Sequence, residues 1–405
     1  MKPARLAVLL LLSIPAQAGD TWRGSRDAAI HATAEATGLQ SGSVLNPANL
    51  YARLAEQAHG IEARINLKLE TDVLRLTLRP ILSLQRRDDG FSTTTASLGT
   101  LSQWQLRAPL SESVSLSLGR EVMNWGPAQF RSPSSPFYFD NGRSNPSREL
   151  SGVDAIKLAW TPDANLAASL AWIQDNGAMQ ASAGNTKVWD NTWLAKGELR
   201  GDDWTGGLVW ARASGRAPFL GAYAQWTPDA AWLVYGEAAS LTRADALRSP
   251  ADPTQPFSLQ SESARHGIAL IGATRTLENG QGLSLEYLRN GQGYSQAEAD
   301  ACFTRAAGNP IAAIQVLSHA PPLLGRNYLH LVWQSNMLAD DNYWRLMWSR
   351  NLDDASQEWA AYYDHPVNRH LSLYALGEIN TGGPRREFSA LIEHSLNLGL
   401  RLALP

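Results

Sequence analysis

Hydrophobic and polar residues alternate along most of this chain, with a period of two. The pattern is clearest near the end, where Ile392, His394, Leu396, Leu398, Leu400 and Leu402 alternate with Glu393, Ser395, Asn397, Gly399 and Arg401. Near the start, the residues from Ile61 to Leu69 alternate in the same way with charged and amide residues. Successive side chains of a β-strand point to opposite faces, so each segment predicts a strand with one apolar and one polar face.

Seventeen segments carry this pattern. They are 60–70, 72–83, 98–107, 113–124, 153–161, 165–174, 191–201, 204–213, 218–226, 230–242, 264–276, 281–290, 327–336, 342–351, 357–364, 370–380 and 389–403. Bacterial single-chain barrels have an even number of strands. We therefore expect one further strand within residues 40–59, which gives about 18 strands; a 16-stranded barrel is the alternative. The alanine-rich segment 27–37 predicts a short helix before the barrel.

Alternation alone does not separate a membrane barrel from a soluble sandwich, because both have one apolar and one polar face. Three further features favour the barrel. The chain has 15 Trp against 8 Phe, and Trp and Tyr recur near the ends of segments, as in the aromatic girdles of barrels. Short connections, such as 161–165 and 201–203, alternate with long ones, such as 243–263 and 291–326. The tetrapeptide Trp-Thr-Pro-Asp recurs at 160–163 and 226–229, where short turns are expected.

The first residues predict export. Lys2 and Arg5 precede an apolar stretch from Leu6 to Leu12, and small residues follow at Ala16 and Ala18, so residues 1–18 have the pattern of a cleaved signal peptide. Its removal leaves 33 basic and 38 acidic residues, a net charge of −5, which argues against nucleic-acid binding. The single cysteine excludes an intrachain disulfide framework.

The expected fold is an all-β, transmembrane antiparallel β-barrel over 60–405, with residues 19–59 as a short N-terminal periplasmic segment that includes the first strand.

Residues 125–152 interrupt the alternation with a long segment that fits neither helix nor paired strand. Pro127, Pro133, Pro136 and Pro146 lack a backbone donor, and each favours an extended conformation in the residue before it. The segment is nevertheless rich in aromatic residues, which a solvated tail is not. It connects two strands on the outer side, and a barrel this wide encloses a channel unless something fills it. We expect the loop either to fold inward as a pore constriction or to cap the barrel from outside.

Charged side chains of both signs are expected to face the lumen. The candidates for contact with a solute or glycan are Trp125, Arg131, Tyr138, Asp140, Arg143 and Arg148 in the loop, and Arg64, Lys68, Arg75, Arg79, Lys157, Arg345 and Arg401 on the wall. Two interpretations remain open. These residues either form ion pairs with inward acidic residues and brace the wall, or they form a basic track for a hydrated, acidic glycan, for which arginine forks are suited donors.

The segment Gly-Arg-Glu-Val-Met-Asn-Trp-Gly-Pro, residues 119–127, resembles the strand-to-loop Trp-Gly-Pro element of the capsule-assembly (Wzi-type) outer-membrane barrels. The layout of strands over 60–405 is similar to that group and to alginate-export-like barrels. The resemblance implies a role in bringing secreted polysaccharide to the cell surface or anchoring it there. It also implies polysaccharide, outer-membrane lipid and a periplasmic polysaccharide export protein as partners.

No motif predicts catalysis. The chain lacks a Gly-x-Ser-x-Gly elbow, a His-Glu-x-x-His pair, a Cys-x-x-Cys pair and a phosphate-binding loop, so we expect no enzyme, no metal and no cofactor. Two functions remain for a barrel in the outer membrane: export or surface assembly of polysaccharide, and, as the alternative, passive passage of small polar solutes. A constriction with fixed charges serves the second.

Overall fold

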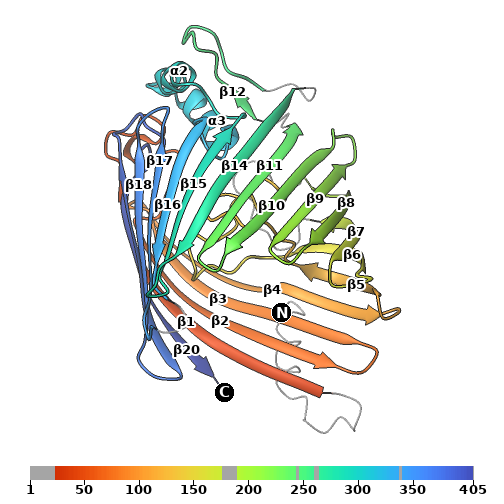
Figure 1. The fold of residues 1–405 in the computed structure, drawn as a ribbon. Helices are drawn as coiled ribbons and strands as arrows, with labels where there is room; N and C mark the ends of the chain where they lie inside the picture. Colours follow the sequence, from red (N-terminus) through yellow and green to blue (C-terminus); the bar gives the residue numbers. More distant parts are fainter. Residues whose placement is uncertain (1–22, 176–188, 243–245, 260–263, 337–339, 405) are drawn as a thin grey trace.

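The chain folds as a closed antiparallel barrel of 18 strands (Figure 1). The computed structural model describes residues 23–175, 189–242, 246–259, 264–336 and 340–404, so the predicted signal peptide lies outside the described residues. The first nine strands are β1 (Arg23–Leu39), β2 (Gln57–Glu70), β3 (Arg75–Asp88), β4 (Thr93–Pro109), β5 (Val114–Glu121), β6 (Val153–Trp160), β7 (Leu166–Asp175), β8 (Thr192–Arg200) and β9 (Trp204–Ala213). The other nine are β10 (Phe219–Asp229), β11 (Trp232–Thr242), β14 (Arg265–Thr276), β15 (Gly282–Asn290), β16 (Asn327–Gln334), β17 (Tyr343–Asn351), β18 (Gln357–Pro366), β19 (Leu371–Thr381) and β20 (Ile392–Leu404).

The remaining elements lie in loops at the end of the barrel that carries the long connections. A hairpin of β12 (Leu247–Arg248) and β13 (Ser258–Leu259) follows β11, and α2 (Gln296–Ala306) and α3 (Pro310–His319) follow β15 (Figure 1). A single 3-10 turn, Pro47–Asn49, lies between β1 and β2. In bacterial barrels the long loops face outward from the cell, so we call this the outer end. Among the described residues, no helix is long and apolar enough to cross a membrane.

All seventeen strands predicted from the alternation are confirmed, but the eighteenth lies elsewhere than expected. Residues 23–39 form β1, so the predicted helix at 27–37 is wrong, and residues 40–56 form an outer loop instead of a strand. β1 pairs with β2 on one side and with β20 on the other, which closes the barrel. Without β1, the edges of β2 and β20 would expose unpaired backbone groups to lipid, and that cost outweighs the helix preference of alanine.

The two faces of the strands are as predicted. Leucines and aromatic residues of the outward face are largely exposed in the isolated barrel, including Leu208 at 70% and Leu398 at 50%. Outward tryptophans and tyrosines form two girdles. Toward the short turns lie Trp160, Trp204, Trp226, Trp232, Trp333 and Trp344, and toward the outer end lie Trp172, Trp193, Trp210, Tyr287, Trp348 and Trp359. Such rings sit at the two membrane surfaces.

The register of β20 leads to a first prediction. Leu398 faces outward, whereas its neighbour Asn397 faces the lumen opposite Glu35 of β1. Leu398→Arg places a charge in the lipid and should lower the free energy of unfolding by about 2–4 kcal/mol. Asn397→Arg should be tolerated, because the new guanidinium can pair with Glu35. Urea titration of the barrel in lipid vesicles measures both; equal losses would contradict the assigned faces.

Candidate functional site: the inward loop

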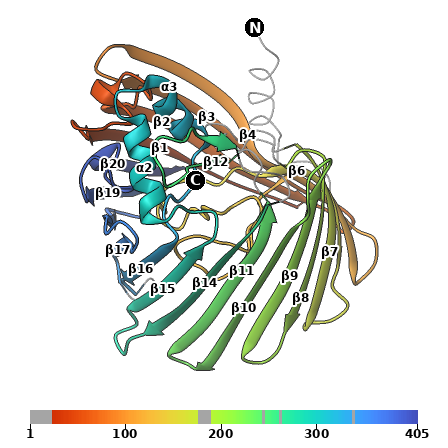
Figure 2. The same cartoon turned by 90° about the horizontal axis from the view of Figure 1, so that it is seen from above.

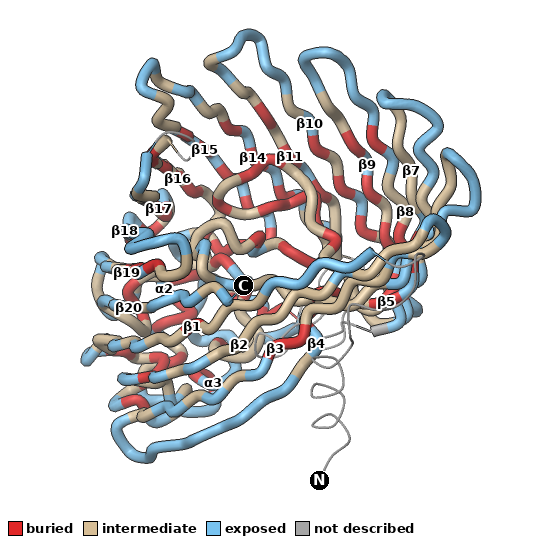
Figure 3. Tube along the Cα trace, turned by 90° about the horizontal axis from the view of Figure 1, so that it is seen from below, coloured by how far each residue is buried: buried red, intermediate tan, exposed pale blue. Residues whose placement is uncertain are grey.

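Residues 122–152, between β5 and β6, cross the interior of the barrel. Figure 2 shows this coil inside the ring of strands, and Figure 3 shows that much of it is buried. The prolines predicted to prevent regular structure do so: the segment contains no helix or strand. Its backbone donors therefore need partners other than a neighbouring strand. Two carboxylates of the barrel wall, Glu237 of β11 and Glu286 of β15, supply many of them.

Glu237 is the first anchor of the loop. Its side chain is 3% exposed and accepts hydrogen bonds from the backbone N–H of Ala128 at 2.9 Å and of Ser134 at 3.2 Å. The hydroxyls of Ser132 and Ser134 also donate to it, at 2.6 and 2.7 Å. Gly126 has φ of +89°, and a Cβ there would collide with the Glu237 carboxylate. The glycine of the Trp-Gly-Pro element therefore allows the backbone to approach this anchor.

Glu286 is the second anchor and is 1% exposed. It accepts hydrogen bonds from the backbone N–H groups of Gln129, at 2.6 Å, and Phe130, at 2.8 Å, and from the Tyr235 hydroxyl, at 2.7 Å. The two anchors together receive seven hydrogen bonds, and six of them come from the loop. Bonds to charged acceptors are stronger than neutral ones, so the anchors hold this part of the loop firmly against the wall.

Arg143 braces the loop from within. Its guanidinium donates to the carbonyls of Gly126, at 3.1 Å, Pro127, at 2.5 Å, and Ala128, at 2.6 Å. Burial lowers the pKa of Arg143, and the negative charges of Glu237 and Glu286 oppose that shift. The side chain that the sequence analysis assigned to glycan contact is therefore committed to carbonyls of its own loop.

Two aromatic candidates are also structural. The Trp125 indole N–H donates to the Ser134 carbonyl at 3.1 Å, and the Tyr138 hydroxyl donates to the Ser151 carbonyl at 2.7 Å. Tyr138 is 3% exposed, and burial raises the pKa of its hydroxyl well above the usual value. Both rings pack against the hydrophobic cluster on the inner wall of β6 to β11. Tyr138 is buried and offers no free face for a sugar ring, whereas Trp125 is half-buried.

Charged side chains remain at the opposite edge of the loop. Arg148 forms an ion pair with Asp140 at 3.0 Å. Burial acts to raise the pKa of Asp140, but Arg131 and Arg148 outweigh it and hold that pKa below its usual value, so the carboxylate stays charged. Arg131 stacks on the Phe130 ring, with its guanidinium carbon 4.6 Å from the ring centre, and interacts electrostatically with Glu358 of β18. The loop thus presents both signs of charge toward the β18 side of the lumen.

The returning limb of the loop is tied to the wall opposite the two anchors. Arg64 of β2 donates to the Ser147 carbonyl at 3.1 Å and lies 3.7 Å from the Glu149 carboxylate. The Ser102 hydroxyl of β4 donates to the same carboxylate at 2.8 Å. The loop therefore bridges the lumen from β11 and β15 on one side to β2 and β4 on the other.

Most of the other predicted wall residues have partners. The pairs are Lys157 with Glu121 at 2.6 Å, Arg75 with Glu70 at 3.0 Å, Arg401 with Asp364 at 3.5 Å, Arg79 with Asn66 at 3.4 Å, and Arg345 with Gln129 of the loop at 3.1 Å. Lys68 is exposed near the short-turn end. These pairs connect nearby strands of the wall or join the wall to the loop, and a role of these basic residues in solute contact stays a prediction.

The role of Glu237 and Glu286 as anchors of the loop was not predicted from the sequence. Alternation with a period of two places Glu237 and Glu286 on the inward faces of their strands. The inward orientation of both side chains could therefore be predicted from the sequence. Nothing in the pattern indicated that a loop more than a hundred residues away would bring donors to both. In the described part of the chain, no cluster of three or more His, Cys, Asp and Glu is arranged to hold a metal ion.

Comparison with solved structures identifies similar folds. The chain is similar to Acinetobacter baumannii OccAB1, with a TM-score of 0.59 and 10% identity over 94% of this chain and 96% of the other. Pseudomonas aeruginosa OccK11 (OpdR) gives a TM-score of 0.55 and 12% identity, over 94% and 96% of the two chains. Pseudomonas aeruginosa OprD gives 0.54 and 8%, over 94% and 95%. No protein-family model and no curated protein matches the sequence.

These likenesses show the fold of the chain. It has a porin-like fold, that of an outer-membrane β-barrel with 18 antiparallel strands. The resemblance to capsule-assembly and alginate-export barrels, expected from the Trp-Gly-Pro element, finds no support in the comparisons. The element itself has a local explanation in this fold, because its glycine permits the contact with Glu237.

Proposed function

We propose that this protein is a passive channel for small polar solutes in the outer membrane. The observation that carries the proposal is the loop 122–152, which is fixed across the lumen by Glu237 and Glu286 on one side and by Arg64 and Ser102 on the other. A loop bonded at both sides narrows the passage permanently. A narrow passage with fixed charges selects small hydrated molecules by size and charge.

The charges at the free edge of the loop define the expected selectivity. Arg131 and Asp140 lie near Glu358 of the facing wall, and Arg148 pairs with Asp140. Acidic and basic groups at one level favour solutes that carry both signs or several hydroxyls over ions of a single sign. Sugars, short polar acids and zwitterions are the solute class that this arrangement fits.

Export of polysaccharide, the function that the sequence resemblance implies, requires a passage for a polymer chain. The bonds that hold the loop inside the barrel oppose such a passage, so the geometry favours the channel. The two functions differ in a direct test. Purified protein in liposomes should admit small sugars in a swelling assay, and a deletion strain should keep its surface polysaccharide. Loss of surface polysaccharide on deletion, with liposomes that admit no sugar, would instead establish export.

Arg131 offers a test of the charged edge. Arg131→Ala leaves Asp140 and Glu358 less compensated, so the permeability ratio of cations to anions should rise. A change of about 1 kcal/mol, the interaction of two charges about 4 Å apart in water, corresponds to about fivefold in this ratio. The reversal potential in a salt gradient across a planar bilayer measures it.

Arg75→Ala is the matched control for Arg131→Ala. Arg75 lies at the short-turn end, exposed and paired with Glu70, away from the loop. Its removal should shift the reversal potential little. An equal shift in both variants would show that the loop edge does not set the selectivity.

A further inference from the structure

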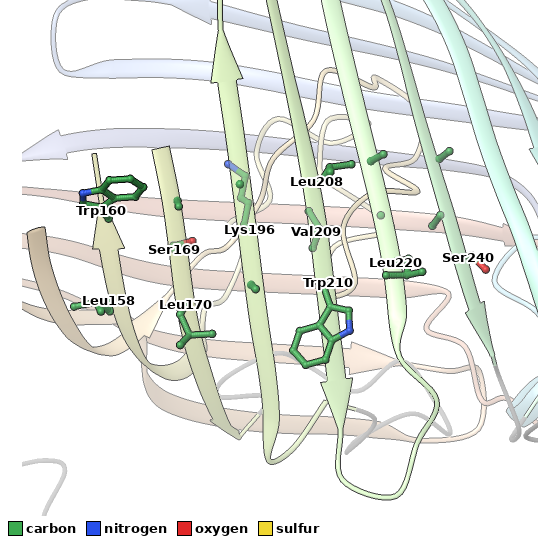
Figure 4. Close-up of a pocket in the computed structure, with 17 residues that line it drawn as sticks. Leu158, Trp160, Ser169, Leu170, Lys196, Leu208, Val209, Trp210, Leu220 and Ser240 are labelled. Atoms are coloured by element: carbon green, nitrogen blue, oxygen red, sulfur yellow. The ribbon is translucent and has the colours of Figure 1, made fainter. Parts of the chain in front are cut away.

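The lipid-facing wall carries an apolar groove that the channel function does not use. It runs over the outward faces of β6 to β11, and Figure 4 shows its lining. Leu158, Leu170, Leu208 and Leu220 form its sides. Its floor consists of small outward residues on β8, β10 and β11, namely Ala195, Gly197, Ala222 and Ala238. A Cβ on Gly197 would meet no atom within 4 Å, so the groove is open there.

Two arginines stand at the outer end of this groove. Trp210, Leu220 and Ser240 lie level with one another across β9, β10 and β11. Arg212 is two residues beyond Trp210 on the same outward face, and Arg265 of β14 pairs with Thr242, which is two residues beyond Ser240. Both guanidinium groups are therefore one pleat above the groove, on either side of its mouth.

The two arginines differ in how they are held. Arg265 donates to the Ser240 hydroxyl at 3.1 Å and to the carbonyls of Pro218 and Ser240 at 3.1 and 3.2 Å, which fixes its direction. Arg212 is exposed, and among the described residues none forms a hydrogen bond or ion pair with it. In the part of the chain that the structure describes, neither guanidinium group is paired with a carboxylate, so both can bind an external anion.

The short turns at the other end of these strands are acidic, and the outward Arg275 of β14 at that end stacks on Trp232. The short turns carry Asp163, Asp203 and Asp229, and Trp160 and Trp204 mark the membrane surface there. These carboxylates repel an anionic head group, so we place the head of a lipid that lies in the groove at the end of Arg212 and Arg265. Burial of acyl chains against leucine side chains is favourable because it removes apolar surface from water. The guanidinium group of an arginine can donate two parallel hydrogen bonds to phosphate oxygens.

We propose that this groove, with Arg212 and Arg265 at its mouth, is a binding site for a phosphorylated lipid of the outer leaflet. The phosphate group contacts the two guanidinium groups at the level of the outer aromatic girdle, and the acyl chains follow the leucines toward the short-turn end. The site is separate from the lumen and does not depend on the proposed channel function.

Native mass spectrometry of the purified full chain in detergent tests the site, with bisphosphorylated lipid A as the probe. Wild type should retain the lipid, and the double variant Arg212→Gln with Arg265→Gln should bind it about thirtyfold more weakly, since each arginine near an anionic lipid surface contributes about fivefold. Arg275→Gln is the matched control, because Arg275 is an outward arginine of the same strand that stacks on Trp232 at the opposite end. It should bind as wild type does.

Two further measurements test the phosphate contact and the apolar groove separately. Lipid A stripped of its phosphates should bind wild type weakly; equal binding would overturn the phosphate contact. Gly197→Leu fills the groove without touching either arginine and should also reduce retention. Heat-modifiable migration on a gel confirms that each variant forms a barrel. Unchanged affinity in the double variant, an equal loss in Arg275→Gln, or oligomers of this chain that carry no lipid on the groove would each contradict the proposal.

Discussion

Replacing Glu237 and Glu286 together by Gln should raise the single-channel conductance several-fold. The two carboxylates accept the bonds that hold residues 128–134 of the loop against the wall. A glutamine has one acceptor oxygen, and its amide N–H₂ would face the backbone donors instead of accepting from them. Leaving buried donors without a partner costs about 1–3 kcal/mol each, enough to release the loop while the strand ladder remains intact. Conductance in planar bilayers measures the opening.

Two companion variants make this result interpretable. Replacing residues 126–150 by a short Gly-Ser linker removes the constriction altogether and should give the largest conductance. Glu378→Gln changes a carboxylate of the wall that accepts from Ser395 of β20 and from no loop residue among those described, so its conductance should stay near wild type. If loop removal leaves conductance unchanged, the loop does not obstruct the channel.

The outer loops should loosen as the pH rises from about 4.5 to about 7. Glu387, in the connection between β19 and β20, accepts from the backbone N–H of Leu324 at 2.7 Å, the Tyr328 hydroxyl at 2.5 Å and the Asn351 amide at 2.7 Å. It therefore joins its own connection to the connection that precedes β16 and to the outer ends of β16 and β17. Burial raises the pKa of Glu387 from 4.5 to about 7, and the nearby charge of Asp354 acts in the same direction.

The sign of the effect follows from the raised pKa. The loops in their closed state favour the protonated acid, so their stability is complete below pH 4.5 and falls as the pH rises from 4.5 to about 7, with no further loss above that. The loss amounts to about 3 kcal/mol, or roughly a hundredfold in the opening equilibrium. Hydrogen exchange of the Leu324 and Gly325 amides between pH 5 and pH 8, corrected for intrinsic rates, should show it.

Glu387→Gln removes the titrating group from this network. In this variant, the Leu324 and Gly325 amides should have the same protection from hydrogen exchange at pH 5 and at pH 8, once the rates are corrected for intrinsic exchange. The periplasmic turn amide of Thr71, bonded to the Leu74 carbonyl far from Glu387, is an internal reference. A pH dependence that persists in the variant would show that Glu387 does not cause the effect.

Alternation by itself was enough to predict seventeen strands and their two faces, because a strand in lipid must direct one face to the acyl chains and the other to the lumen. The eighteenth strand, β1, could not be predicted from alternation. Residues 23–39 are rich in alanine, and local preference favours a helix. Only the closed barrel, in which β1 satisfies the edges of β2 and β20, decides in favour of a strand.

The loop between β5 and β6 also has some features that the sequence predicts and others that only the tertiary structure decides. Its prolines determined, from sequence alone, that 125–152 would be irregular, and its aromatic residues indicated that it would be covered. The path of the loop was decided by partners distant in the chain, such as Arg345, which reaches Gln129 across 216 residues. Arg143 and Tyr138 looked like solute contacts and proved to be internal braces. Sequence determines the direction of a side chain because strand geometry is local, but which groups it meets depends on how the barrel closes.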